Sequence, residues 1–354
     1  MDAQALIFLA QILLMLIFVL VSVNLYLLFK LKDIDPFRSW NRDSINGGLF
    51  MALWVVGVIV SGVASYVWWD EMIMVHSAVS DQGLRIDGMF WRTMVISIIV
   101  TLLTNTLLFY FSWKYRNKKG QKAFHYAHNN RLEFIWTIIP AITLTILVID
   151  GVAAWHDIMG DVPEEAVEIE LNAKQFDWTI RYPGADLEFG EAHVKYINEA
   201  TANQLGFNFE DRNGHDDIVA TELHMPVDHP VKFTIKSRDV IHSATLVHFR
   251  MKMDAVPGMA THFWVTPNKT TAEMRKDLGD DNFNYELSCQ QICGASHWNM
   301  RRIVVVETME EYQAWLASQQ PFYAQWQQMN GGATTASTEN LSNEQLDVAI
   351  SVNP

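Results

Sequence analysis

The stretch at 289–300 is Cys289-Gln290-Gln291-Ile292-Cys293-Gly294-Ala295-Ser296-His297-Trp298-Asn299-Met300, and it holds both cysteines of the chain. Two thiolates, an imidazole and a thioether form a soft ligand set that suits copper. The stretch contains no aspartate or glutamate, which makes it a poor site for calcium, magnesium or manganese. We therefore predict a copper site here.

The neighbouring sequence predicts how a metal could be enclosed. The apolar, β-branched residues Ile303 to Val306 indicate a strand directly after the stretch, and Val231 to Ile235 indicate another strand. His242 follows at the end of that second run. Twelve residues cannot surround a metal alone, so we expect a loop between two strands, with His242 supplied by a neighbouring strand.

Two cysteines can bind one copper each or share two. A mononuclear blue site needs one Cys with two His and a Met, and leaves the second Cys surplus. The closeness of the cysteines favours bridging. We therefore expect a dinuclear copper centre held by Cys289, Cys293, His242, His297 and Met300, with one backbone carbonyl from the loop. The alternative is a local disulfide, which would leave both histidines and the methionine unexplained.

Charge divides the chain in two. Residues 1–155 carry a net charge of +2, whereas residues 156–354 carry 14 basic and 30 acidic side chains, a net charge of −16. An acidic soluble part argues against nucleic acid as a partner. It favours a basic protein partner attracted over long range, although an acidic surface that only confers solubility would have the same composition.

Four apolar stretches in the first part are each close to the length that spans a bilayer: residues 5–29, 48–69, 90–113 and 134–155. The loops after the first and third are rich in Lys and Arg, whereas residues 70–89 have only Arg85. By the positive-inside rule, the first and third loops face the cytoplasm. We therefore predict a membrane domain at 1–155 with four transmembrane helices, and a soluble part on the outer face.

Polarity rises after residue 155. Val167 to Leu171 alternates as a half-buried strand does, and short strands separated by Pro and Gly suggest a Greek-key β-sandwich over 156–312. The polar segments 185–222 and 271–284 are predicted to be loops or insertions. Residues 308–328 have helical spacing of aromatic residues, and the last 25 or so suit a flexible tail, giving a C-terminal region at 313–354.

The 289–300 stretch resembles the CuA motif of subunit II of the haem-copper cytochrome c oxidases, usually Cys-x-Glu-x-Cys-Gly-x-x-His-x-x-Met. The segments Asp239–Ser243, Lys252–Met259 and Gln175–Trp178 resemble that family too, as does Leu132–Pro140. The resemblance covers about residues 90–312. The two apolar stretches at 90–113 and 134–155 are similar to the two membrane helices that the family commonly has.

The resemblance implies a cupredoxin domain with two copper ions, on the periplasmic side of a bacterial inner membrane. Electrons would come from cytochrome c, or from a tethered c-type haem domain, and would pass to haem in subunit I. There oxygen is reduced to water with proton translocation, so this chain would be one subunit of the oxidase beside others.

At the family's loop glutamate this sequence has Gln291. The resemblance implies that its backbone carbonyl binds copper, a role that any side chain permits. The family's glutamate side chain also binds magnesium at the subunit interface. An amide is a poorer ligand for a hard cation than a carboxylate, so the magnesium site is doubtful here.

The resemblance assigns roles to three further residues. Phe176 stands where relatives have the tryptophan that starts the electron path, and Trp178 is expected on the same strand face by period-two alternation. Either could serve, and the alternative is that both are core aromatics. Glu133 would lie at the mouth of a proton path into subunit I, or be an ordinary carboxylate at the membrane surface. Asp239 and Asp254, which lie near the copper motifs, could orient a ligand histidine, bind at the subunit boundary or shape turns.

The first two apolar stretches depart from the usual pattern. They could form a hairpin that contacts lipid, or dock another respiratory complex, such as alternative complex III, in a supercomplex. Three other functions compete with electron entry: a membrane-anchored protein for copper binding or delivery, a structural subunit of a quinol oxidase, and the copper domain of a nitrous-oxide reductase.

Overall fold

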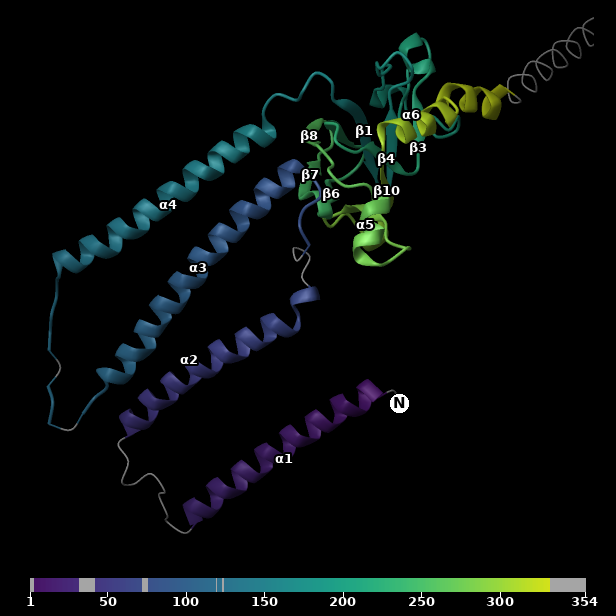
Figure 1. Ribbon diagram of the computed structural model, residues 1–354. Coiled ribbons are helices and arrows are strands. Elements are labelled where there is room, and N and C mark those ends of the chain that lie inside the picture. The colour runs from purple at the N-terminus through teal and green to yellow at the C-terminus, as the bar shows by residue number, and fades with distance from the viewer. Residues whose placement is uncertain (1–2, 32–41, 72–75, 119, 123, 332–354) are drawn as a thin grey trace, which may run out of the picture. The chain divides into compact units, whose positions relative to one another are not determined.

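The computed structural model describes residues 3–31, 42–71, 76–118, 120–122 and 124–331 (Figure 1). It divides into two compact units, residues 1–70 with 95–135, and residues 71–94 with 136–354. The predicted flexible tail falls at 332–354, outside the described residues.

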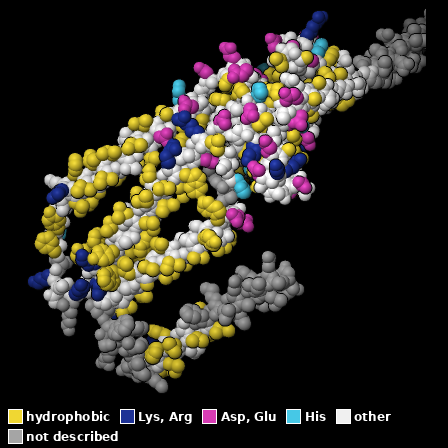
Figure 2. Space-filling model, in the orientation of Figure 1, with side chains coloured by type: hydrophobic (Ala, Val, Ile, Leu, Met, Phe, Trp, Pro, Cys, Tyr) yellow, Lys and Arg dark blue, Asp and Glu magenta, His cyan; other side chains and the backbone are white. Residues whose placement is uncertain are grey.

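Four helices precede the soluble domain: α1 (Ala3–Leu31), α2 (Arg42–Val67), α3 (Asp81–Lys114) and α4 (Asn130–Met159). Among the described residues, three are long and apolar enough to cross a membrane, namely α2, α3 and α4. The described part of α1 adds a shorter apolar helix, Val19–Leu31. Apolar side chains cover the outside of these helices (Figure 2), as a lipid environment requires. The count of four spans stays a prediction.

Within the first unit α2 packs along α3. The Trp54 Nε1 donates to Thr106 Oγ1 over 3.1 Å, and the Trp54 ring stacks on Phe109 with centroids 5.6 Å apart. A polar contact of Arg116 Nε with Ser44 Oγ, 3.1 Å, lies nearer the ends of the same two helices. The second apolar stretch is therefore joined to the third by side chains and not only by the loop.

The soluble part is the β-sandwich that the sequence predicts. Within residues 124–331 the structure contains two five-stranded sheets, ordered β3-β2-β1-β5-β8 and β4-β10-β9-β6-β7. The bounds are β1 (Val167–Lys174), β2 (Asp177–Tyr182), β3 (Ile218–Ala220), β4 (Leu223–Pro226), β5 (Val231–Ser237), β6 (His242–Leu246), β7 (Met251–Ala255), β8 (Thr261–Val265), β9 (Tyr285–Cys289) and β10 (Arg301–Glu307). Alternate residues such as Ile169 and Leu171 are fully buried between the sheets.

Two local predictions need correction. Residues 271–284 were expected to form a loop, but α5 (Thr271–Leu278) is helical because Thr270 and Glu273 form a capping box and Met274 is buried in the core. The single helix expected over 308–328 is interrupted at Pro321: α6 (Met309–Ser318) is followed by a second helical segment at 322–331. Short 3-10 helices lie at Trp69–Glu71, Val194–Tyr196, Arg212–His215, Val247–Phe249 and His297–Asn299.

The loop or insertion predicted over 185–222 is confirmed for residues 183–217, which lie between β2 and β3 without regular strands, but the prediction is wrong at 218–220, which form β3. The insertion is held to β2 by Arg181, whose Nη2 lies 2.5 Å from Asp217 Oδ2 while Nη1 lies 3.7 Å from Glu170 Oε1. All three side chains are buried. Phe207 also stacks on Phe322, with centroids 4.8 Å apart, so the insertion and the C-terminal helical segment pack together.

A joint connects the start of α3 to the sandwich within the second unit. Asp87 accepts from Arg250 Nε over 2.7 Å and from the Ala78 N–H over 2.9 Å. Val79 N–H donates to the His248 carbonyl, 2.9 Å, and Ser80 Oγ donates to the Phe249 carbonyl, 2.8 Å. The segment 78–80 is buried, so this joint is part of the domain core.

Candidate metal centre

Two neighbouring strands bring His242 close to the loop that carries the other candidate ligands. β9 ends at Cys289 and pairs with β6, so that Cys289 is opposite Ala244, two residues from His242. The loop closes on itself, because Cys289 N–H donates to the Met300 carbonyl over 3.0 Å. His242 begins β6 in the second sheet and does not end β5, but its strand does neighbour the cysteine strand, as the sequence predicts.

Five predicted donor side chains converge. The Cys289 and Cys293 Sγ atoms are 4.0 Å apart; His242 Nδ1 lies 3.8 Å from the first, and His297 Nδ1 lies 3.6 Å from the second. Met300 Sδ lies 3.9 Å from Cys293 Sγ. The cysteines, His242 and Met300 are buried, and His297 is half-buried.

The loop carbonyl lies where the prediction requires. The Gln291 carbonyl oxygen is 3.3 Å from Cys289 Sγ, and the Gln291 side chain is exposed. Both cysteines are free thiols, since their separation is about twice a disulfide bond length of about 2.05 Å. The geometry therefore leaves both sulfurs available as ligands.

Burial, and then the neighbouring Cys289, raise the pKa of Cys293 to about 11. Without a metal the Cys293 thiol is therefore neutral at physiological pH. A metal ligand must be the thiolate, so metal binding has to displace this proton. A thiophilic ion such as copper does this well, and the donor set of two sulfurs, two imidazoles, one thioether and one carbonyl fits copper.

Asp239 orients His242. Its Oδ1 lies 2.8 Å from His242 Nε2, which leaves Nδ1 facing Cys289. Its Oδ2 accepts from the Gln175 N–H over 2.7 Å. Burial opposes the charge of Asp239, but hydrogen bonds from Gln175, His242 and Val240 lower its pKa. A carboxylate behind a ligand imidazole fixes the ring and its tautomer.

The two candidate entry aromatics differ sharply. Trp178 is 0% exposed in the core, with its ring 6.2 Å from that of His242, whereas Phe176 is 36% exposed. The expectation that both share a strand face is wrong, because Lys174 pairs with Asp177 and places Phe176 in the tight turn between β1 and β2. Alternation does not continue through a turn.

Gly294 and Gln175 support the site in ways that the sequence analysis missed. A Cβ on Gly294 would lie 2.7 Å from the Phe176 ring, and the φ of Gly294 is +143°. The side-chain amide of Gln175 donates to the Cys293 carbonyl. A glycine directly after a predicted ligand was the available signal for a close approach. The Phe176 ring therefore lies against the loop that carries the cysteines.

Glu133 lies in the first turn of α4, where its Oε1 accepts from the Asn129 N–H over 3.2 Å. Asn129 Oδ1 in turn accepts from the Leu132 N–H over 3.1 Å. These reciprocal bonds cap the helix. Glu133 thus has a structural role, and its place on a proton path stays a proposal.

Comparison with known proteins gives the family. Residues 66–152 match the transmembrane domain of cytochrome c oxidase subunit II, and residues 167–309 match its periplasmic domain. The first match includes α3 and most of α4, whereas α1 and most of α2 precede it.

Curated relatives agree. The alternative cytochrome c oxidase subunit 2 of Bradyrhizobium diazoefficiens is 31% identical over 276 residues, covering 77% of this chain and 92% of that protein. The cytochrome c oxidase subunit 2 of Cereibacter sphaeroides is 27% identical, covering 68% of this chain and 77% of that one. The crystal structure of the periplasmic domain of cytochrome oxidase subunit II of Bradyrhizobium japonicum is 22% identical, covering 45% of this chain and 96% of that chain, with a TM-score of 0.31.

The apolar helices and the two domain matches make this a membrane-anchored protein with a periplasmic β domain. Such a chain is one subunit of an oxidoreductase. On these matches, the chain belongs to the cytochrome c oxidase subunit II family.

Proposed function

We propose that this chain holds a dinuclear CuA centre and is the electron-entry subunit of its oxidase. The observation that carries this proposal is the convergence of two free thiols, 4.0 Å apart, with His242, His297 and Met300. Bound there, a copper pair would take up and release one electron at a time. The family supports copper, and the donor set supports its placement.

The chain's own groups would favour rapid electron exchange by holding the ligands in place. Asp239 fixes the His242 ring, strand pairing fixes Cys289, and the Gln175 amide holds the Cys293 carbonyl, so these ligands would have little freedom to move when the charge changes. The two thiolates, two imidazoles, the thioether and the Gln291 carbonyl would hold the copper pair, and a copper pair held by protein donors would supply electron transfer. The site would therefore transfer electrons to haem in subunit I, where oxygen is reduced and protons are translocated.

The exposed Phe176 ring and the acidic surface of the soluble domain indicate where electrons would enter. Phe176 is partly exposed and packs on the Cys293–Gly294 backbone, so it would link the surface to the centre. Acidic side chains gather over the soluble domain (Figure 2), and residues 156–354 carry a net charge of −16 in a chain whose total is −14. A basic cytochrome c, free or tethered, would be drawn to this face.

The Phe176→Ala variant is expected to slow electron uptake from cytochrome c by about tenfold or more, the size of a truncated contact at an interface hot spot. The copper spectrum should stay unchanged, because Phe176 is not a ligand. Stopped-flow reduction of the copper site measures this rate. Phe176→Tyr keeps the ring and should keep the rate. An unchanged Phe176→Ala rate, with a slow Trp298→Ala, would place entry at the exposed Trp298 instead.

Other parts of the proposal rest on the sequence pattern and the family. The chain would cross a bacterial inner membrane four times, with residues 1–155 as membrane domain, 156–312 as CuA domain and 313–354 as C-terminal region. Glu133 would mark the entrance of a proton path. The N-terminal pair of helices would contact lipid or another respiratory complex. Magnesium at the interface stays doubtful, because Gln291 offers only an amide.

Copper loading tests the function. The full chain, purified in detergent and supplied with copper, is expected to bind two coppers. Its electron paramagnetic resonance spectrum should show one unpaired electron shared by both. A single-copper spectrum would remove the dinuclear centre. Copper that transfers readily to a chelator would indicate the delivery function instead.

A further inference from the structure

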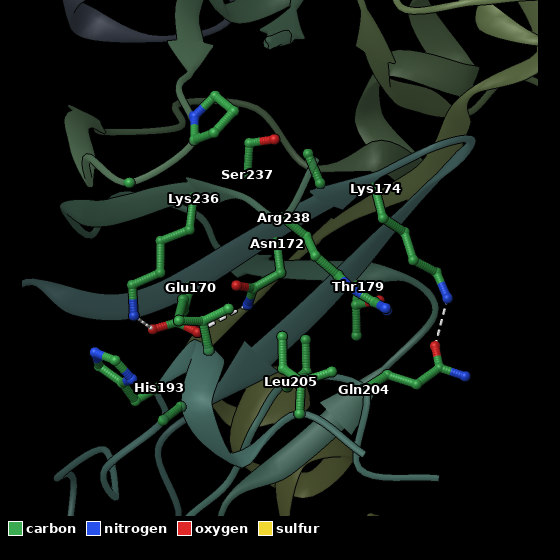
Figure 3. Close-up of a pocket in the computed structure, with 16 residues that line it drawn as sticks. Glu170, Asn172, Lys174, Thr179, His193, Gln204, Leu205, Lys236, Ser237 and Arg238 are labelled. Carbon is green, nitrogen blue, oxygen red and sulfur yellow. Dashed lines mark hydrogen bonds and ion pairs between the residues drawn. The ribbon is translucent and has the colours of Figure 1, made fainter. Parts of the chain in front are cut away.

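A cavity of about 290 Å³ lies against the outer face of the first sheet, away from the core side (Figure 3). β1 and β5 form its floor, where Asn172 and Lys236 are paired in register. The insertion between β2 and β3 covers it with Ile197 and Leu205, and the loop at Pro257 closes one edge. The mechanism proposed above uses none of this space.

The cavity is positively charged on an acidic domain. Among the described residues that line it, Lys174, Lys236 and Arg238 are basic and Glu170 is acidic. With His193 neutral, the lining carries a net charge of +2. Residues 156–354 have a net charge of −16, so this concentration of cations is the reverse of its surroundings.

Glu170 already has its partners. It accepts from Asn172 Nδ2 over 2.8 Å, forms an ion pair with Lys236, and lies 3.7 Å from Arg181 Nη1. Burial opposes its charge, yet the Arg181 and Lys236 charges lower its pKa. Glu170 is therefore ionised and neutralised by groups of the sheet, which leaves the other two lining cations to be accounted for.

Lys174 and Arg238 have weaker partners. Within the described chain, the hydrogen bond of the Lys174 ammonium goes to the neutral amide of Gln204. Arg238 pairs with Glu199, whose side chain is 65% exposed. Exposed ion pairs contribute little, so an incoming anion can compete with Glu199 for the guanidinium. Arg and Lys together supply a planar fork and a point charge, which suit phosphate or carboxylate oxygens.

We propose that this cavity binds a small organic dianion, a phosphate monoester or a dicarboxylate, through Lys174 and Arg238. The volume is just below the range of about 300–1,000 Å³ for drug-sized ligands, so a short carbon skeleton fits. Ile197, Leu205 and Pro257 offer that skeleton an apolar wall. A phospholipid diester such as phosphatidylglycerol carries one charge and matches the lining less well.

The test uses the full chain in detergent, titrated by isothermal calorimetry with glycerol 3-phosphate and, separately, with succinate. At least one dianion should bind saturably, more weakly as salt rises, while glycerol should not bind. The Lys174→Gln variant should weaken binding by about tenfold or more, since it removes a charge-assisted contact.

Lys195→Gln is the matched control. Lys195 lies in the insertion that covers the cavity, but it does not line the cavity and pairs with Glu191. Its replacement removes one positive charge, as Lys174→Gln does. Its affinity should equal that of the unmodified chain. The proposal is overturned if neither dianion binds, if both variants weaken binding equally, or if only micelles containing phosphatidylglycerol bind. Circular dichroism of each variant checks that the sandwich remains folded.

Discussion

Replacing Cys293 with serine is expected to abolish the paired-copper spectrum and to lower cytochrome c oxidation at least about 100-fold. Loss of a residue that hydrogen-bonds a metal ligand lowers metal affinity or activity by about 10–100-fold. Loss of the ligand itself should lower them further. Cys293 Sγ lies 3.6 Å from His297 Nδ1 and 3.9 Å from Met300 Sδ. A serine hydroxyl is a hard donor that copper binds poorly.

Ser296→Ala is the matched control for this variant. Ser296 lies in the same loop, is exposed, and makes no capping hydrogen bond with its side chain. Copper content, the resonance spectrum and oxygen consumption should all stay at the level of the unmodified chain. A Cys293→Ser protein that kept two coppers with a shared electron would show that Cys293 is not a ligand.

Replacing Arg181 with leucine is expected to destabilise the sandwich by about 3–5 kcal/mol, the cost of leaving a buried charge without its partner. The change leaves Asp217 and Glu170 buried without the guanidinium. It also removes the guanidinium from the Phe207 ring, 4.4 Å away. Hydrogen exchange of the β1 and β2 amides measures the loss within the full chain.

The loss in Arg181→Leu should depend on pH. Burial already raises the pKa of Asp217 to about 6 with Arg181 present, and without Arg181 that pKa should rise further. A carboxyl with a raised folded-state pKa favours folding at low pH and loses that contribution as pH rises through the pKa. The loss of unfolding free energy in Arg181→Leu should therefore be smaller below about pH 6 than at neutral pH.

Lys269→Met provides the comparison. Lys269 forms an ion pair with Asp277 at 2.6 Å, but the two side chains are 35% and 55% exposed, so the cost should stay below about 1 kcal/mol. Equal losses in both variants would mean that the buried pair contributes no more than a surface pair.

The convergence of the candidate copper ligands could be predicted because it depends mainly on local spacing, whereas their binding of copper stays a proposal. Cys289, Cys293, His297 and Met300 share one loop, and His242 needed only a neighbouring strand. The roles of Phe176 and Trp178 could not be separated, because the turn that ends the alternation is set by the Lys174–Asp177 pairing. The helix α5 was missed although Thr270 and Glu273 carried its signal, since a polar composition was taken for a loop.

Contacts between distant segments gave no sequence signal. Arg181 meets Asp217 across an insertion, and the Lys174 and Arg238 side chains line one cavity only after β1 and β5 pair in parallel. Nothing in the local patterns around these residues indicates such partners. Charge composition correctly indicated an acidic domain but could not show a basic cavity within it.

The joint of Asp87 with Arg250 constrains when this part of the protein can fold during synthesis. These residues are 163 positions apart, and Asp81 N–H also donates to the Thr266 carbonyl. The joint therefore cannot close until synthesis and export have passed Thr266, after α4 is complete. Until then Val79 and its neighbours, which end up in the core, lack part of the contacts that bury them. A chain that ended before Thr266 would be anchored in the membrane by its helices, but residues 78–87 would be incompletely packed. Membrane proteases should therefore degrade it early.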